Sequence, residues 1–351
     1  MGKITIVGLG AGDMSQLPMG VYQLLQSNQP IYLRTKLHPV VTQLAEEGLI
    51  MASFDAIYEQ NQQFDGVYEQ VVKELLQLAE QQDIIYAVPG HPMVAEKTVQ
   101  LLLKEQQQIT VEIAGGQSFL DDFFTAVKID PIEGFQLLDA LALNGDQLQM
   151  SQHLIIMQVF DAFVASDVKL LLTEKYPDDH QVALVHEAGS ANEVVEWKPL
   201  YEIDRMEGVH NLTSLYVPPL PLDERTTEFA TLQSYMDEIT GPTGDIWIRE
   251  QNNQSLVPYL EEETAELIAA IEKDDIDNMV EELGDILMQV MYHASIGEKE
   301  GMFTFEEMLA TLNKKLRRRH PHVFDGVTIN SIAELDQLWQ KIKETEKRKH
   351  Q

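Results

Sequence analysis

Apolar runs and helix-like amphipathic runs alternate along the first part of the chain. Residues 3–12, KITIVGLGAG, form an apolar run that ends in glycines, which is typical of a buried strand followed by a tight turn. Residues 20–35 then place a helical pattern ahead of a second apolar run, and residues 67–92 and 95–116 repeat that order. The alternation predicts crossover units on a mainly parallel sheet.

Residues 154–219 carry a different pattern, in which several apolar runs follow one another with fewer helical stretches between them. We interpret this region as a second, α+β subdomain. The segment VPPLPLDERTTEF, residues 217–229, is rich in proline and then in charge, which is typical of the exit from a domain.

From about Pro258 the pattern is helical throughout. Residues 257–275 and 276–296 carry apolar positions every three or four residues, a third amphipathic segment begins near Phe305, and residues 333–350 make a last helix. The expected organisation is an α/β region of two subdomains, a linker at residues 221–240 and a helical region that is clear from about Pro258.

The composition narrows the classes of partner. The chain has 351 residues, with 25 Lys and Arg against 57 Asp and Glu and a formal net charge of -32. The electric field of so negatively charged a chain repels phosphate backbones and anionic lipids, so we expect neither nucleic acid nor a membrane as partner. The absence of cysteine excludes disulfides and thiolate metal sites. The N-terminal apolar run is too short for a signal peptide, and we expect a cytoplasmic location.

Acidic residues gather at helical spacing in the first two helices of the all-α region. Three residues, Glu262, Glu263 and Glu266, share one side of the first helix, and Glu282 and Asp285 lie three apart on the second. Carboxylate oxygens are the ligands that Mg²⁺ prefers, and Mg²⁺ held in this way recruits substrate phosphates. The alternative is that these acids only form a solvated helix face, which is common in an acidic chain.

A basic tract follows the acidic helices. The sequence KKLRRRHPHVF, residues 314–324, places Lys315, Arg318 and Arg319 ahead of a predicted His-Pro-His turn. Arginine and lysine side chains are suited to binding phosphate groups. The tract also fits a helix end, where cations favour the macrodipole, and both interpretations can hold together.

Three motifs of this region resemble the MazG family of nucleoside triphosphate pyrophosphohydrolases. They are WIREQNNQSLVPYLEEETAEL (residues 247–267), EELGDILMQVMYHA (281–294) and KLRRRHPHVF (315–324). The resemblance covers residues 241–351 and implies an all-α fold that hydrolyses an NTP to NMP and pyrophosphate. It implies that the five acids hold Mg²⁺, with Glu262 or Glu263 able to accept the proton of the attacking water. It also implies substrate-binding residues, which are Trp247, Arg249, Gln251, Lys315, Arg318, Arg319, Trp339 and Lys343.

The first MazG motif departs from the family pattern. Members usually carry Cys-Pro-Trp-Asp ahead of the Gln, whereas this chain has Asp245-Ile246-Trp247-Ile248. The aspartate is replaced by Ile248, and a histidine that follows in the family is replaced by Asn253. The metal-binding acids are unaffected by these changes.

Glycine-rich loops follow three predicted strands in the α/β module. VGLGAGD (residues 7–13) does not fit the dinucleotide fingerprint, because Asp13 stands where a third glycine is needed. VPGHP (88–92) and AGGQS (114–118) each directly follow a further strand. Ligands in open α/β sheets bind at the carboxyl ends of strands, although a single such loop can equally be only a tight turn.

These loops resemble those of the tetrapyrrole (corrin/porphyrin) methylase family, and the match covers residues 1–220. The resemblance implies S-adenosylmethionine as cofactor and a small heterocyclic methyl acceptor. The implied cofactor-binding residues are Gly8, Gly10, Gly12, Asp13, Pro89, Gly90, His91, Pro92, Gly115, Gly116 and Ser118. His91 stands where many members have aspartate, and a plain turn histidine is an equal alternative for it. The whole chain resembles proteins in which a methylase and a MazG domain are fused.

We therefore expect a Mg²⁺-dependent NTP pyrophosphohydrolase joined to a methylase-like module. One alternative is a methyltransferase whose C-terminal domain is regulatory. Another is a non-catalytic sensor that binds nucleotide and S-adenosylmethionine. A homo-oligomer is expected because a short helical module would otherwise expose apolar faces.

Overall fold

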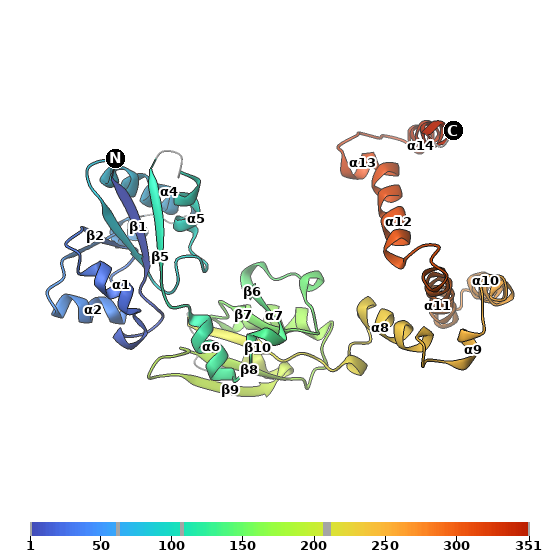
Figure 1. The fold of residues 1–351 in the computed structure, drawn as a ribbon, viewed down its shortest axis with the longest axis horizontal. Helices are drawn as coiled ribbons and strands as arrows, with labels where there is room; N and C mark the ends of the chain where they lie inside the picture. The colour runs from blue at the N-terminus through green and yellow to red at the C-terminus, as the bar shows by residue number, and fades with distance from the viewer. Residues whose placement is uncertain (1, 61–63, 106–108, 206–211, 350–351) are drawn as a thin grey trace. The chain divides into compact units, whose positions relative to one another are not determined.

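The chain divides into two compact units, Met1–Arg225 and Thr226–Gln351. The structure, a computed structural model, describes residues 2–60, 64–105, 109–205 and 212–349. The first unit holds two five-stranded sheets with helices on them, and the second is built of helices (Figure 1). The expected fold classes, α/β with two subdomains followed by all-α, are confirmed.

The first sheet is entirely parallel, with the strand order β3-β2-β4-β1-β5. Its strands are β1 (Lys3–Gly8), β2 (Ile31–Leu33), β3 (Met51–Ser53), β4 (Ile84–Val88) and β5 (Thr110–Gly115). Its helices are α1 (Met19–Leu25), α2 (Pro39–Glu46), α3 (Asp55–Gln60), α4 (Phe64–Ala79) and α5 (Lys97–Lys104). A short 3₁₀ helix, η1, spans Met14–Gln16.

The alternation of β1 explains how this sheet is buried on both faces. Successive side chains of a strand point to opposite faces. Ile6 belongs to one apolar cluster with Leu75 of α4, and its neighbour Val7 belongs to another with Leu44 of α2. Both faces are therefore covered by helices, which is why the strand reads as a continuous apolar run.

The second sheet is mixed, with the order β6-β7-β10-β8-β9, and only the β6–β7 pair is parallel. Its strands are β6 (Phe135–Asp139), β7 (His153–Met157), β8 (Gln181–His186), β9 (Val194–Pro199) and β10 (Thr213–Val217). The helices here are α6 (Phe119–Val127) and α7 (Ala162–Thr173), with 3₁₀ helices η2 (Pro131–Glu133), η3 (Ala140–Ala142), η4 (Gly145–Gln147), η5 (Leu200–Arg205) and η6 (Leu222–Glu224). The edge strands β6 and β9 were not predicted, because they are only partly buried and lack a long apolar run.

The second unit begins with two helices, α8 and α9, that the sequence pattern did not predict, and the predicted helices follow them. Its helices are α8 (Phe229–Thr240), α9 (Ile246–Arg249), α10 (Val257–Glu272), α11 (Ile276–Lys299), α12 (Phe305–Arg319), α13 (Pro321–Phe324) and α14 (Ile332–Lys349). The segment expected as a linker, 221–240, contains α8, and Met236 of α8 lies in an apolar cluster with Met291 and Phe305. The predicted His-Pro-His turn is the start of α13, a single helical turn with Pro321 in its first position.

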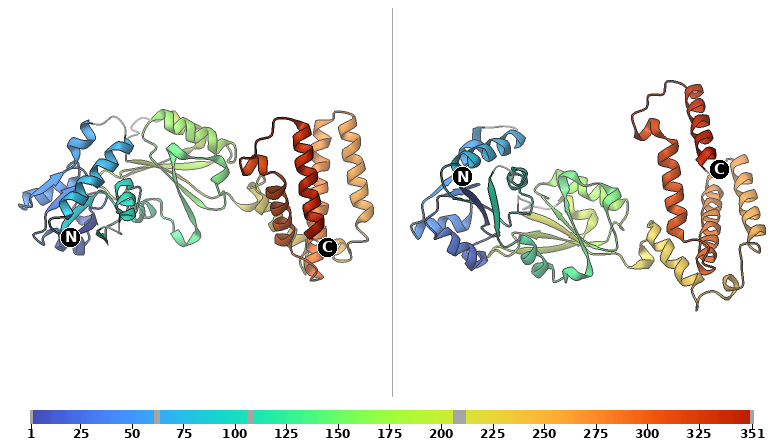
Figure 2. Two further views of the ribbon diagram at one scale, coloured as in Figure 1. Left: turned by 90° about the horizontal axis from the view of Figure 1, so that it is seen from above. Right: turned by 45° about the horizontal axis from the view of Figure 1, so that its top comes forward.

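Two long helices, α10 and α11, lie side by side as a hairpin (Figure 2). Residues 273–275 connect them, with Asp274 in the left-handed region at φ 52°, a conformation that aspartate tolerates better than most residues. Asp275 then caps α11 by accepting a hydrogen bond from the backbone N–H of Asn278 at 3.4 Å. The short connection makes the two helices antiparallel neighbours, so that their acidic positions can meet.

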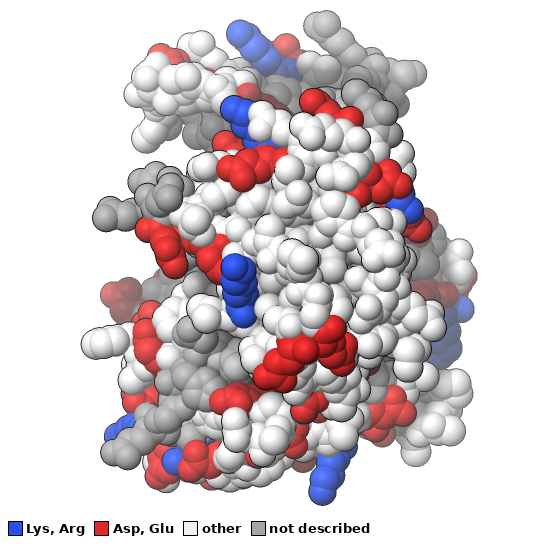
Figure 3. All heavy atoms as spheres, turned by 90° about the vertical axis from the view of Figure 1, so that its left-hand side faces the viewer, with Lys and Arg blue, Asp and Glu red and all other residues white. Residues whose placement is uncertain are grey.

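On the face drawn in Figure 3, acidic side chains predominate over basic ones and are scattered among neutral residues. No helix in the described part of the chain is both long and apolar enough to cross a membrane.

Candidate functional site

A cluster of three carboxylates spans the α10–α11 hairpin. One carboxylate oxygen from each of Glu263, Glu266 and Glu282 lies within 4.8 Å of the other two. The two members on α10 are three residues apart and share a helix face. Glu282 reaches them from α11, whose close contact with α10 brings the acids together. The predicted convergence of acids from the two helices is therefore present in the geometry.

The acids of this cluster disfavour one another's charge. Burial raises the pKa of Glu263, and the charges of Asp285, Glu266 and Glu262 raise it further. The pKa of Glu282 is raised in the same way, first by loss of solvent and then by neighbouring carboxylates. Asp285 therefore belongs to the cluster electrostatically, while Glu262 is exposed beside it. The pattern is that expected where like charges share a site.

The carboxylate oxygens of this cluster are suitable ligands for a hard divalent cation. One oxygen of Glu282, Oε2, is buried without a hydrogen-bond partner, which is costly for a carboxylate unless something else satisfies it. Three or more carboxylate oxygens within a few ångströms are the ligand set that Mg²⁺ prefers. The residues present therefore suit Mg²⁺.

Two buried polar atoms on α11, in Gln289 and His293, were missed in the sequence. Gln289 is only 3% exposed, and its Oε1 is buried without a partner. His293, one turn further along α11, donates from Nδ1 to Asn253 Oδ1 at 2.7 Å, and its buried Nε2 has no hydrogen-bond partner. Single polar residues within an apolar helical stripe give no spacing signal, so only the three-dimensional placement identifies them.

The predicted substrate residues of the first motif are held in place by local contacts. The Trp247 ring is 43% exposed and packs edge-on against Tyr259, with 5.2 Å between ring centroids. Arg249 donates to Pro242 O at 2.8 Å, and Gln251 donates to Trp247 O at 3.1 Å. Trp247 is thus partly open to solvent, whereas the other two side chains stabilise the turn around it.

The departure from the family motif has a structural explanation. Asp245 caps α9 by accepting hydrogen bonds from the N–H groups of Trp247 and Ile248. Ile248 is buried in an apolar cluster with Leu256 and Ile296. The position where relatives of the MazG family carry an aspartate is therefore part of the core here.

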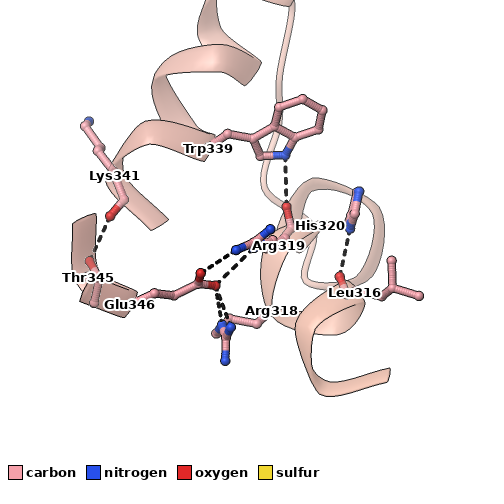
Figure 4. Close-up of polar contacts among 8 residues, drawn as sticks. All are labelled: Leu316, Arg318, Arg319, His320, Trp339, Lys341, Thr345 and Glu346. Atoms are coloured by element: carbon pink, nitrogen blue, oxygen red, sulfur yellow. Dashed lines mark hydrogen bonds and ion pairs between the residues drawn. The ribbon is translucent and has the colours of Figure 1, made fainter. Parts of the chain in front are cut away.

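The basic tract is paired with the last helix (Figure 4). Arg318 and Arg319, at the end of α12, both form ion pairs with Glu346 of α14. The indole N–H of Trp339 donates to Arg319 O at 3.1 Å. Lys315 and Lys343 are exposed. Among the contacts in the described part of the second unit, none joins this tract to the carboxylate cluster.

In the first unit the three glycine loops converge. A Cβ on Gly8 would lie 2.2 Å from Gly90 O and 3.0 Å from Gly116 Cα, so the backbones approach as closely as glycine allows. The N–H of Gly90 donates to Gly10 O at 2.7 Å. Because β1 lies between β4 and β5, all three loops leave the same sheet edge, as the sequence predicts.

The polar side chains of these loops mostly serve the backbone. Asp13 caps η1, and hydrogen bonds from Ser15 lower its pKa. His91 Nδ1 accepts from the N–H of Met93 at 3.1 Å, and Ser118 caps α6. The turn alternative for His91 is thus the one that its contacts support.

A histidine outside the predicted set supports the first glycine loop. His38 Nδ1 accepts the N–H of Val40, so its Nε2 carries the proton and donates to Gly10 O at 2.9 Å. Burial lowers the pKa of His38, which keeps the ring neutral and preserves this arrangement.

A second buried contact ties the loop region to the second subdomain. Gln16 is 5% exposed, and its amide N–H donates to Asp122 at 2.8 Å and to Gly189 O at 3.0 Å. The nearest sequence neighbour among these partners is 106 residues away, so no local pattern could have revealed the contact.

Comparison with known proteins identifies both modules. The family model "Tetrapyrrole (Corrin/Porphyrin) Methylases" matches residues 3–204, and that of the MazG nucleotide pyrophosphohydrolase domain matches residues 251–324. The uncharacterized protein YabN of Bacillus subtilis is 48% identical over 349 residues, which are 99% of this chain and 71% of YabN. The chain belongs to the fused methylase–MazG family.

Two further comparisons each cover one module of this methylase–MazG protein. The nucleoside triphosphate pyrophosphohydrolase/pyrophosphatase MazG of Thermotoga maritima is 47% identical over 121 residues, 34% of this chain and 46% of that protein. The chain therefore spans less than half the length of that relative. A structure from Entamoeba histolytica, provisionally described as a diphthine synthase, matches 65% of this chain and 98% of its own at 12% identity, with a TM-score of 0.51. That likeness shows the fold alone.

The carboxylate cluster predicts a stability test on the methylase–MazG protein. Folding raises the pKa of Glu282 above 4.5, so the folded state binds more protons than the unfolded state as Glu282 titrates. The free energy of unfolding of the metal-free protein therefore falls as the pH rises above 4.5. We expect Glu282→Gln to raise the metal-free melting temperature at pH 7 and to flatten its fall as the pH rises above 4.5. Calorimetric melting with and without Mg²⁺ measures both effects.

The matched control is Glu261→Gln, a charge removed from an exposed position of α10 outside the cluster. Wild type and this control should gain melting temperature on addition of Mg²⁺, and Glu282→Gln should gain much less. A metal-free Glu282→Gln protein that melts below wild type would contradict the repulsion described here.

Proposed function

We propose that the helical unit is a Mg²⁺-dependent nucleoside triphosphate pyrophosphohydrolase, which converts an NTP and water to NMP and pyrophosphate. The observation that carries the proposal is the meeting of Glu263, Glu266 and Glu282 within 4.8 Å across the hairpin. The match to the MazG model over residues 251–324 supports it. Mg²⁺, when bound, supplies charge neutralisation of the phosphates and lowers the pKa of a bound water.

The chain's own residues have separate tasks in this proposal. The three clustered glutamates and Asp285 hold the metal. Glu262, exposed beside them, or Glu263 accepts the proton of the water whose oxygen attacks the α-phosphorus. The bond between that phosphorus and the bridging oxygen breaks, and pyrophosphate leaves. In our proposal Trp247, whose ring is partly exposed, stacks on the base.

The cationic residues face the leaving group in the same proposal. Arg318 and Arg319 can each present parallel N–H donors to phosphate oxygens, and Lys315 adds a point charge. Trp339 and Lys343 lie on α14, which contacts the end of α12 through Arg319. Arg249 and Gln251 act in our proposal by holding the Trp247 turn rather than by touching phosphate.

Hydrolysis is tested with a panel of canonical and modified NTPs, Mg²⁺ and measurement of released pyrophosphate. We expect metal-dependent release from wild type, and a fall of about a hundredfold or more for Glu263→Ala, because a metal ligand is lost. The control Glu272→Ala removes a carboxylate from the end of the same helix and should keep wild-type rates. Pyrophosphate release that is independent of metal, or equal in Glu263→Ala, contradicts the proposal.

We propose S-adenosylmethionine binding by the first unit as a second activity. The close backbone approach of Gly8, Gly90 and Gly116 at one sheet edge supports it, because ligands in such sheets collect where strand ends meet. The family match over residues 3–204 supports it as well. A small heterocyclic molecule is the acceptor class that the family suggests.

Calorimetric titration with S-adenosylmethionine tests this binding. Wild type should give a saturable heat, and Gly116→Ala should weaken binding because its Cβ would lie 2.6 Å from Gly8 Cα. That clash should also lower the free energy of unfolding by about 1–3 kcal/mol. Gly20→Ala, whose Cβ meets nothing within 4 Å, is the control. No heat with wild type up to about 1 mM ligand contradicts binding. Nucleotide binding without turnover or methyl transfer would favour the sensor alternative.

We also propose that the protein is a homo-oligomer through the helical unit. One face of α11 is apolar and exposed, with Ile276, Val280, Leu283 and Leu287 at 65%, 69%, 53% and 40%. Such a stripe is unusual on a monomer surface. Light scattering should give at least twice the chain mass, and Val280→Glu should lower it, whereas a monomeric wild type contradicts the proposal.

A further inference from the structure

Glu346 on α14 binds two arginines at the same time (Figure 4). Arg318 donates from Nε to Oε1 at 2.7 Å, and its Nη2 lies 2.6 Å from the same oxygen as an ion pair. Arg319 donates to Oε2 from Nη2 at 2.6 Å and to Oε1 from Nε at 3.2 Å. The Glu346 side chain is 15% exposed, and these contacts use most of the hydrogen-bonding capacity of its carboxylate.

Each guanidinium keeps a free edge. A guanidinium has five N–H donors in a planar fork, and Glu346 uses only those on Nε and Nη2. In the described part of the chain no acceptor is bonded to Nη1 of Arg318 or Arg319. Their side chains are 52% and 30% exposed. The two cations are therefore fixed along one edge and open along the other, with one positive charge left in excess.

The helix that carries Glu346 is itself fixed at the same place. Trp339 lies seven residues earlier, two turns back on the same face of α14, and donates to Arg319 O at 3.1 Å. Its ring also lies 6.2 Å from the His320 ring. Glu346 thus meets the arginines from a helix already anchored to the end of α12.

The neighbouring arginine provides a contrast. Arg317 pairs with Asp325, eight residues away, and both side chains are about half exposed. This pair closes the local turn through α13 and does not involve α14. The same basic tract therefore contains one arginine with a local ion pair and two arginines that form ion pairs with a distant helix.

We infer that Glu346 is a positioning residue for the proposed hydrolysis, which holds Arg318 and Arg319 so that their free edges face the departing pyrophosphate. The inference rests on the proposed function of the helical unit. Two guanidinium groups fixed beforehand bind two phosphate oxygens without a further loss of side-chain freedom.

The ionisation of Glu346 fits this role. Hydrogen bonds from Arg319, ahead of those from Arg318, lower its pKa to about 2. The carboxylate is therefore charged throughout the neutral range, and the arrangement is independent of pH there. Glu346 does not act as a competitor for the phosphate, since it occupies only the Nε edge of each arginine.

The test compares Glu346→Gln, Glu346→Asp and the control Asp325→Asn in the full chain. Glutamine offers one oxygen and one NH₂ group, and that NH₂ group meets a guanidinium donor, so at most one arginine stays in place. We expect Glu346→Gln to lower kcat/KM for an NTP by about tenfold to a hundredfold and to raise the inhibition constant for pyrophosphate by a similar factor. Glu346→Asp keeps both oxygens and should restore much of the loss. Asp325→Asn should change neither value.

Each outcome is decisive. If Glu346→Gln keeps the wild-type pyrophosphate inhibition constant, or binds pyrophosphate more tightly, the positioning role is overturned. An equal loss in Asp325→Asn would also overturn it, because the effect would then be general to the tract. If wild type hydrolyses no NTP, the proposed function fails separately. Calorimetric binding of pyrophosphate with Mg²⁺ to wild type and Glu346→Gln then tests the inference by itself.

Discussion

The crowding of carboxylates across the α10–α11 hairpin is the constraint that the helical unit has to meet. Glu263, Glu266 and Glu282 bring their oxygens within 4.8 Å, and neighbouring carboxylates raise the cost of that charge, which a hydrogen bond from Gln289 to Glu263 offsets only in part. A domain has only about 5–15 kcal/mol of net stability, so the hairpin must be held by contacts elsewhere. The apolar clusters around Met291 and Ile296 of α11, which engage α8, α9 and α12, provide them.

The parts of this site that could be predicted are those set by local geometry. Helical spacing places Glu263 beside Glu266, and a three-residue connection makes the next helix their neighbour, so Glu282 follows. Glu346 could not be found in this way, because its partners lie 27 and 28 residues earlier and meet it only through the placement of α14. The helix α8 was hidden by the proline-rich, charged segment before it, which resembles a linker.

The first unit shows the same division between local and distant information. Glycines after strands can be recognised in the sequence as sites of close backbone approach, because no other residue allows an approach such as that of Gly8 to Gly90. Which glycine loops contact one another depends on the strand order, since Gly8 and Gly116 meet only because β1 pairs directly with β5. Polar residues in the loops have contacts that the sequence pattern did not indicate: Asp13 and Ser118, predicted to contact a ligand, each cap a helix.

The placement of the cations is the strongest physical argument for a phosphate ligand. In a chain with 25 basic and 57 acidic residues, arginines could have neutralised the carboxylate cluster and stabilised the hairpin. Two of them are instead held by a single carboxylate on α14, which leaves a local excess of positive charge and leaves the cluster negative. Folding stability alone does not favour leaving the carboxylate cluster without a cation. A triphosphate with a divalent cation complements both, because its phosphates match the arginines and its metal matches the acids.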